Sequence, residues 1–262
     1  MKGFINSHKN GRIYIRVSAM LTVCLMIFTF ALGIRILTGI RAEAAATSGI
    51  DKTNNDNSGE TEETPSEIVD KPKEIPWYLV LVNRDNPIPD GYVPTLAYVD
   101  GKNHQVDERI ADALVRMLKD CRKNGLDPMI CSSYRTNETQ ENLFESMVKK
   151  YKNQGMSSEE AVNAAKIIVA YPGTSEHQLG LAADIVSRKY QVLDKKQEQT
   201  KVYQWLKEHC VEYGFIVRYP DEKTDITGII YEPWHFRYVG IEAAREIMSE
   251  GITLEEYLDS QS

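Results

Sequence analysis

The stretch 173-GTSEHQLGLAADI-185 decides how this chain folds, because it places one histidine and one acid seven positions apart among small and apolar residues. On a straight strand, about 3.3 Å per residue would hold His177 and Asp184 roughly 23 Å apart. Gly180 and the polar pair Ser175-Glu176 favour a bend between them. We therefore expect His177 on a loop and Asp184 pointing inward from the strand that follows.

On both sides of this stretch, segments whose apolar residues recur with the period of a strand alternate with segments that have the period of a helix. Gly125 and Gly214 mark two helix ends, and Ser157 with Glu160 forms a capping-box signature. The fold class predicted is α+β, a small and mostly antiparallel sheet with helices packed around it. The expected strands are 77–82, 128–133, 181–186, 215–219 and 228–239, and the expected helices are 106–124, 136–151, 158–170, 202–214 and 241–249.

An apolar run near the N-terminus predicts a membrane segment. Residues 17–34 carry no charge over 18 positions, which is just enough for a helix to cross the hydrocarbon core. The cations that precede the run should hold the N-terminus in the cytoplasm and deliver the rest of the chain to the outer side of the membrane. These cations are Lys2, Lys9, Arg12 and Arg16.

The sequence accordingly divides into four segments. Residues 1–16 form a cytoplasmic basic N-terminus, 17–40 a transmembrane anchor or signal segment, 41–75 an acidic low-complexity stalk, and 76–262 the folded domain. We expect a single-pass protein of the cell membrane with an extracytoplasmic domain. The alternative is secretion after cleavage near Ala42-Glu43-Ala44, which fits a signal-peptidase site.

Composition excludes some classes of protein. The chain is 42% hydrophobic and 26% charged, which suits one globular domain, and its net charge of −7 offers no basic stripe for nucleic acid. Outside the apolar run lie Cys121, Cys131 and Cys210, with no C-x-x-C pair. We expect these three to be buried free thiols, and we expect the protein to be a monomer.

A second segment, 231-YEPWHFRY-238, supplies the remaining parts of a metal site. Together with His177 and Asp184, His235 completes two imidazoles and one carboxylate, a zinc shell that leaves the fourth position for water. Glu232 is then a spare carboxylate beside the metal. Because Pro233 disfavours a helix, we expect Glu232 and His235 on a strand whose twist or bulge turns both towards the ion, which places the zinc site on the sheet.

This set of residues predicts metal-assisted hydrolysis. Zinc lowers the pKa of a bound water towards about 7, and a carboxylate outside the metal shell can take the proton and pass it to a leaving amine. Glu232 is the candidate general base, and amide hydrolysis is the reaction that fits. His104 and His209 are expected to be solvated and unconnected with the metal.

Arg135 is the second candidate catalytic residue. It follows the strand 128–133, where its guanidinium can bind a substrate carboxylate or stabilise a developing oxyanion. Four further residues are weaker candidates for contacts with substrate, although a tryptophan in a strand is as well explained as part of the core. These are Ser133, Gln140, Ser175 and Trp234.

Three motifs in this order, "SSYR", "GTSEHQLGLAADI" and "EPWH", resemble the signature of the VanY-type D-alanyl-D-alanine carboxypeptidases. The family pattern S-x-H-x-x-G-x-A-x-D followed by E-x-W-H is met without departure, and the likeness covers about residues 77–258. It implies a zinc metallocarboxypeptidase, not a serine-type D,D-peptidase, that removes the terminal D-Ala from peptidoglycan stem pentapeptides or their lipid-linked precursor. It further implies zinc ligands His177, Asp184 and His235, Glu232 as base, and Arg135 near the scissile amide.

Two alternatives stay open at this point. Relatives in the same superfamily act as L,D-carboxypeptidases on stem tetrapeptides, and the zinc machinery does not distinguish the two. The domain could also be a cell-wall binding module that kept the fold without turnover.

Overall fold

The computed structural model describes residues 75–261. The strands are β1 (Leu96–Val99), β2 (His104–Asp107), β3 (Pro128–Ser132), β4 (Ala182–Ser187), β5 (Phe215–Val217) and β6 (His235–Tyr238). The helices are α1 (Glu108–Lys123), α2 (Asn137–Asn153), α3 (Ser158–Lys166), α4 (Lys201–His209), α5 (Thr224–Thr227), α6 (Ile241–Glu250) and α7 (Leu254–Ser260). Short 3-10 helices are η1 (Trp77–Leu79), η2 (Glu176–Leu179), η3 (Lys195–Gln199) and η4 (Cys210–Tyr213).

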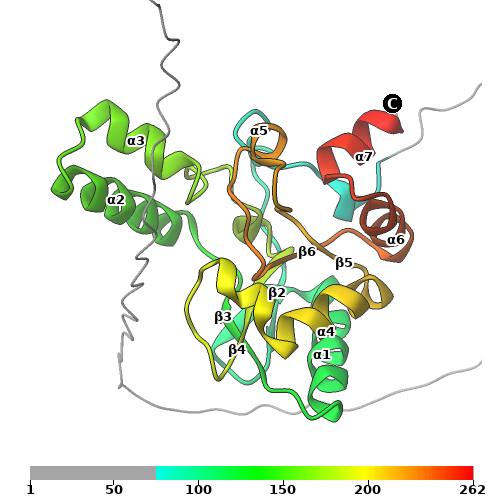
Figure 1. Cartoon of the computed structure of the whole chain (residues 1–262). Coiled ribbons are helices and arrows are strands. Elements are labelled where there is room, and N and C mark those ends of the chain that lie inside the picture. Colours follow the sequence, from blue (N-terminus) through cyan, green and yellow to red (C-terminus); the bar gives the residue numbers. More distant parts are fainter. Residues whose placement is uncertain (1–74, 262) are drawn as a thin grey trace, which may run out of the picture. The chain divides into compact units, whose positions relative to one another are not determined.

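The central element is an antiparallel sheet with the order β3-β4-β6-β5, and β1 and β2 form a separate hairpin. Helices α1 and α4 pack together at the sheet, α2 and α3 form a pair that projects from it, and α6 adjoins α7 (Figure 1). This arrangement confirms the predicted α+β class with a small antiparallel sheet. Its strands come from distant parts of the chain, so the sheet brings separate motifs side by side.

The two faces of the sheet differ in chemistry. Ala183, Ile185, Phe236 and Phe215 point into an apolar core shared with α1 and α4. Since successive side chains of a strand alternate between faces, the residues between them face the other way. On β4 and β6 these are Asp184, His235 and Arg237, all buried. One face therefore holds the larger apolar core, and the other holds a buried polar cluster beside a second apolar cluster of Ile216 with α6 and α7.

Several predicted elements are wrong in extent. Residues 77–82 form η1 and an irregular segment instead of a strand, because the carbonyls of Tyr78 and Val80 accept from the guanidinium of Arg237 and pair with no strand. The predicted strand 228–239 shrinks to β6, and the helix 158–170 ends at Lys166. The hairpin β1–β2 and the helices α5 and α7 were not predicted.

The cysteines follow the prediction in two of three cases. Cys121 and Cys210 are buried free thiols, and burial raises their pKa values to about 11 and about 12. Cys131 is exposed, which corrects the expectation of burial, and its Sγ lies 3.4 Å from the carbonyl oxygen of Asp184. Cys131 lies at a register shift between Ile130 and Ser132 in the pairing of β3 with β4.

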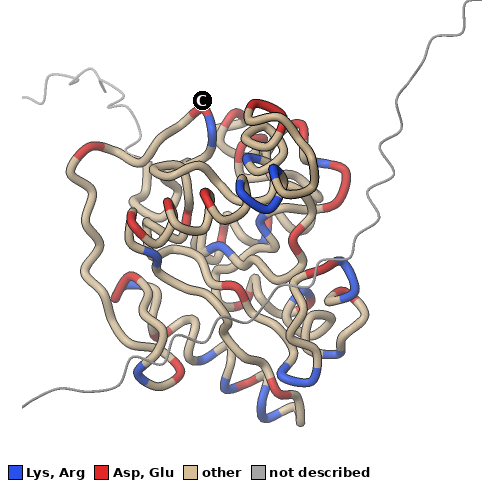
Figure 2. The backbone as a smooth tube through the Cα atoms, turned by 90° about the vertical axis from the view of Figure 1, so that its left-hand side faces the viewer, with Lys and Arg blue, Asp and Glu red and all other residues tan. Residues whose placement is uncertain are grey.

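The predicted segments 1–16, 17–40 and most of 41–75 lie outside the described residues. Between residues 75 and 261, no helix is long and apolar enough to span a membrane. Acidic and basic residues are interspersed along this part of the chain (Figure 2).

Gly180 lies at the bend between His177 and Asp184, and its replacement tests that bend. Its φ is +73°, and a Cβ added there would lie 2.8 Å from the backbone nitrogen of Asp107. Gly173 has a similar φ of +83° but no atom within 4 Å of such a Cβ. We expect Gly173→Ala to lower the free energy of unfolding by about 1 kcal/mol and Gly180→Ala by clearly more, measured by denaturant titration. Equal costs for the two variants would contradict the close packing at Gly180.

Candidate metal centre

Two neighbouring strands and a 3-10 turn bring three metal-binding side chains together. Asp184 on β4 is the direct cross-strand partner of His235 on β6. His177 lies in η2, which ends at Gly180 with left-handed backbone and returns the chain to the start of β4. The bend expected between His177 and Asp184 is present, and it replaces the large separation of a straight strand by direct contact.

Two pairs of donor atoms have the spacing of ligands around a tetrahedral ion. Asp184 Oδ1 lies 3.1 Å from His235 Nδ1 and 3.3 Å from His177 Nε2, and the donor atoms of all three residues lie within 4.8 Å of one another. Metal bonds of 2.0–2.1 Å at tetrahedral angles place donors about 3.3 Å apart. All three residues are buried. Two imidazoles and one carboxylate in this arrangement fit Zn²⁺ and leave one coordination position for water or substrate.

The second nitrogen of each imidazole has its own partner. His177 Nδ1 lies 2.8 Å from the carbonyl oxygen of Ser133, and His235 Nε2 lies 3.1 Å from Glu176 Oε2. Both partners accept hydrogen bonds, so each of these nitrogens carries the proton. His177 Nε2 and His235 Nδ1, which face Asp184, are the nitrogens available to a metal once they are deprotonated, as is usual for histidine ligands.

Burial and charge set the protonation of the two histidines. Burial, together with the nearby Arg135, lowers the pKa of His177 to about 4, so its imidazole is neutral. Burial also acts to lower the pKa of His235, but Asp184 and Glu176 outweigh it and raise the pKa to about 9. A more basic imidazole is a stronger metal ligand.

Glu232 reaches the site through a turn and not through a strand or bulge. The amide of His235 donates to the carbonyl oxygen of Glu232 at 3.2 Å, closing the turn that contains Pro233 and Trp234. This corrects the expectation for the local backbone, although both side chains do face the same place. Glu232 Oε2 lies 3.9 Å from His235 Nδ1, outside the group of three donors. Burial raises the pKa of Glu232 to about 8, a range suited to taking up and releasing a proton.

Arg135 is tied to the metal residues. It donates from one terminal nitrogen to Asp184 Oδ2 at 3.0 Å, from the other to Gln140 Oε1 at 3.2 Å, and from Nε to Ser132 Oγ at 2.8 Å. Its side chain is 17% exposed. The guanidinium therefore lies against the second oxygen of Asp184 and still reaches solvent.

The weaker candidates divide by what their polar atoms contact. Ser133 offers its carbonyl to His177, while its hydroxyl accepts from the amide of Gln105. Gln140 is fully buried, and its amide nitrogen donates to the carbonyl of Ala170 at 2.7 Å, so both ends of this side chain are in use within the protein. Ser133 therefore positions His177, and Gln140 positions Arg135.

Ser175 and Trp234 are also buried. The hydroxyl of Ser175 stays a candidate for contact with substrate. The backbone carbonyl of Trp234 accepts from the amide of Ile185 at 2.8 Å.

The other described histidines lie away from the three donors. His209 Nδ1 pairs with Glu212 at 2.8 Å on an exposed surface. His104 begins β2 and is half-buried, which corrects the expectation of a solvated side chain, and its Nδ1 lies 3.5 Å from the hydroxyl of Ser133.

Sequence reasoning missed the residues behind His235. Glu176 contacts its ring, and Arg218 and Arg237 contact Glu176; all three are almost completely inaccessible to solvent. A signal was present, because an arginine in each of the apolar strands "FIVRY" and "HFRYV" must find a buried carboxylate.

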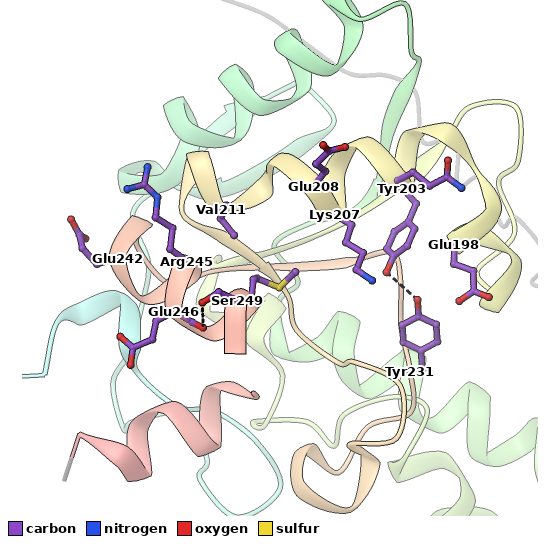
Figure 3. A pocket seen from close by; sticks show the side chains of 12 residues that line it. Glu198, Tyr203, Lys207, Glu208, Val211, Tyr231, Glu242, Arg245, Glu246 and Ser249 are labelled. Carbon is purple, nitrogen blue, oxygen red and sulfur yellow. Dashed lines mark hydrogen bonds between the residues drawn. The ribbon is translucent and has the colours of Figure 1, made fainter. Parts of the chain in front are cut away.

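Two cavities in the described part of the chain are lined by none of the three donors. The larger, about 1040 Å³, is a groove between α4 and α6 with Tyr203, Tyr231 and Arg245 in its wall (Figure 3). The smaller, about 390 Å³, is lined in part by Thr174 and Tyr219. The ring of Tyr219 lies 4.7 Å from that of His235, so the smaller cavity adjoins the metal residues.

Comparisons with known proteins agree on one family. The model of VanY, D-alanyl-D-alanine carboxypeptidase, matches residues 103–241. A D-alanyl-D-alanine carboxypeptidase of Enterococcus faecalis (strain ATCC 700802 / V583) is 40% identical over 245 residues, which cover 92% of this chain and 87% of that protein.

Solved structures extend the agreement to the fold. VanYB in complex with D-alanine-D-alanine is 45% identical with a TM-score of 0.65, over 71% of this chain and 99% of that one. A VanY D,D-pentapeptidase variant with Zn(II), from a VanB-type vancomycin resistance cassette, is 46% identical with a TM-score of 0.63, over 70% and 99%. The LdcB LD-carboxypeptidase is 38% identical with a TM-score of 0.60, over 68% and 84%.

Proposed function

The chain belongs to the VanY family of D-alanyl-D-alanine carboxypeptidases and is a zinc metallocarboxypeptidase, and from this premise we propose that it trims the pentapeptide stems of peptidoglycan or of its lipid-linked precursor. The reaction is hydrolysis of the last amide bond with release of D-alanine. The observation that carries the proposal is the group of three buried donors with a separate carboxylate 3.9 Å from one of them.

In this proposal His177, Asp184 and His235 hold the zinc ion. When bound, zinc supplies an electrophile that activates water and polarises the scissile carbonyl. Glu232, which lies beside the donors without being one of them, takes the proton of the attacking water and returns it to the leaving amine. Its raised pKa supports both directions of this transfer.

Arg135 binds the substrate in the same proposal. A guanidinium has five N–H donors, and the described residues accept from three of them. The two that remain can bind the terminal carboxylate of the peptide or the oxygen of the scissile carbonyl. Ser175 and Trp234 are further candidates for contact with the peptide at this place.

The proposal includes an extracytoplasmic location. Stem peptides are exposed outside the membrane, and the uncharged run 17–34, preceded by four cations, supports delivery of the domain to that side. A cleaved signal segment would place the domain on the same side as a secreted protein.

The choice of substrate is tested by mass spectrometry of the full chain incubated with muramyl pentapeptide and, separately, with tetrapeptide. We expect loss of one alanine from the pentapeptide alone, abolished by a chelator and restored by zinc. Loss from the tetrapeptide alone would favour an L,D-carboxypeptidase, the activity named for the similar LdcB structure. Binding of either peptide without loss of alanine would favour a non-catalytic wall-binding module.

A further inference from the structure

Glu176 precedes His177 in the chain, but its side chain contacts a different set of residues. Its side chain is completely buried and turns towards the polar face of the sheet. Oε2 accepts from His235 Nε2 at 3.1 Å, while Oε1 accepts from Arg218 Nε at 2.6 Å and from Arg237 at 2.8 Å. One carboxylate thus joins a metal-binding histidine to two arginines.

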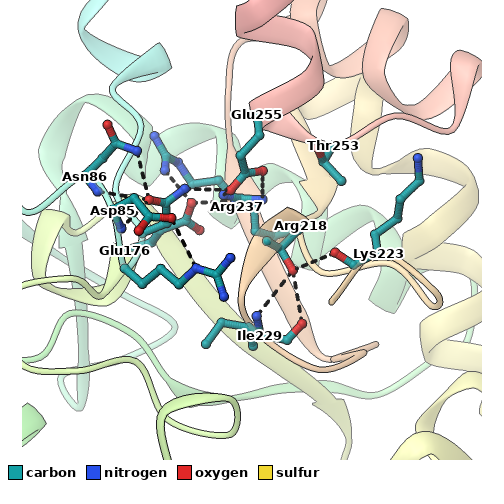
Figure 4. Close-up of polar contacts among 12 residues, drawn as sticks. Asp85, Asn86, Glu176, Arg218, Lys223, Ile229, Arg237, Thr253 and Glu255 are labelled. Carbon is teal, nitrogen blue, oxygen red and sulfur yellow. Dashed lines mark hydrogen bonds and ion pairs between the residues drawn. The ribbon is translucent and has the colours of Figure 1, made fainter. Parts of the chain in front are cut away.

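The two arginines are themselves held from opposite ends of the domain. Arg218 donates from both terminal nitrogens to Glu255 of α7, at 2.8 and 2.7 Å. Arg237 donates to the backbone carbonyls of Tyr78 and Val80, each at 2.9 Å. Figure 4 shows Glu176, Arg218, Arg237 and Glu255 converging from separate segments of the chain. These contacts leave the carboxylate of Glu176 little freedom to move.

A buried carboxylate so placed has a defined effect on the histidine. By accepting from Nε2–H it fixes the tautomer and the ring plane of His235, and its charge raises the basicity of Nδ1. Oε1 of Glu176 lies against the buried guanidiniums of Arg218 and Arg237, which give this carboxylate two partners of opposite charge inside the protein.

We propose that Glu176 is a positioning residue for His235, and that it sets the strength with which His235 binds the metal. The inference rests on the proposed function only in taking His235 as a ligand. Glu176 does not touch the substrate, and its action passes entirely through the imidazole of His235.

Glu255 provides a matched control for this proposal. It is a second buried carboxylate on the same arginine, and Asn83 also donates to it at 3.0 Å, but it makes no contact with His235 among the described residues. Glu176→Gln and Glu255→Gln each remove one negative charge from the same network. A residue that serves stability alone would give the same result at either position.

The test compares both variants with the wild type in the full chain. Zinc affinity is measured by competition with a chromophoric chelator, and the visible spectrum is recorded after cobalt substitution. We expect Glu176→Gln to weaken zinc binding about 10- to 100-fold, to shift the cobalt spectrum and to lower kcat more than KM changes. Glu255→Gln should lower the thermal stability but change zinc affinity by less than about threefold.

A further variant covers the case in which Glu176→Gln fails to fold. Glu176→Asp keeps the charge that Arg218 and Arg237 require but draws the carboxylate back from His235, and it should still weaken zinc binding about tenfold. Wild-type zinc affinity in the folded Glu176 variants, or an equal loss in Glu255→Gln, would overturn the proposal. Because zinc affinity and the cobalt spectrum need no substrate, these results are independent of whether the protein cleaves pentapeptide.

Discussion

Replacement of Glu232 by alanine is expected to lower kcat for release of D-alanine by about 10²- to 10⁴-fold, with KM and zinc content close to those of the wild type. The carboxylate lies 3.9 Å from His235 Nδ1 and outside the three donors, so its loss removes a proton acceptor and no metal ligand. Steady-state kinetics on the pentapeptide and metal analysis of the purified variant measure the two quantities.

Two further variants sharpen this test. Glu232→Gln keeps the size of the side chain but cannot take a proton, so it should be as inactive as Glu232→Ala. Glu250→Ala, on the exposed last turn of α6, changes the same kind of residue on another element and should leave kcat unchanged. Near-wild-type turnover in both Glu232 variants would show that another group carries the proton.

The grouping of His177 with Asp184 was predictable because the constraint was local. His177 and Asp184 are close in sequence, and only a bend at Gly180 could bring them together, so the sequence itself specified the geometry. The approach of His235 to Asp184 depends on the pairing of β4 with β6. The sequence patterns indicated both strands but not the register between them. The turn at Pro233 was missed because proline is compatible with an edge strand, a bulge or a turn.

The fold was predicted best where helices carry their own end signals. The capping box at Ser157 and Glu160 is present, and the Asp107 side chain caps α1. The same signal was overlooked at Thr253 and Glu256, which form the capping box of α7. Likewise Asp100 and Gly101, a turn pair with positive φ values, mark the hairpin that was not predicted. These two elements could have been predicted from local sequence.

The buried ion network could not have been predicted in the same way. Arg218 lies 42 residues from Glu176 and 37 from Glu255, and nothing local states which acid neutralises which arginine. A buried charge demands a partner, so the sequence predicts that partners exist. Their identity depends on tertiary packing, and with it the contact between Glu176 and His235.

Replacement of Asp184 by asparagine is expected to weaken zinc binding by more than about 100-fold and to reduce D-alanine release to the level of the chelated enzyme. Of the three donors, Asp184 contacts both of the others, at 3.3 Å for His177 and 3.1 Å for His235, and it also pairs with Arg135 at 3.0 Å. Asparagine keeps the shape of the side chain but removes the charge that attracts a dication.

The metal-free stability of the variant separates this effect from misfolding. Asp184→Asn leaves Arg135 without its carboxylate, but Arg135 is partly exposed, so the free energy of unfolding should fall by only about 1–3 kcal/mol. Asp107→Asn is a matched control, because Asp107 is fully buried and accepts from Arg109 Nε at 2.8 Å while capping α1. We expect that variant to lose stability and to keep its zinc. If Asp184→Asn instead bound zinc as tightly as the wild type, the metal would have to lie elsewhere, and the roles of His177 and His235 would be wrong with it.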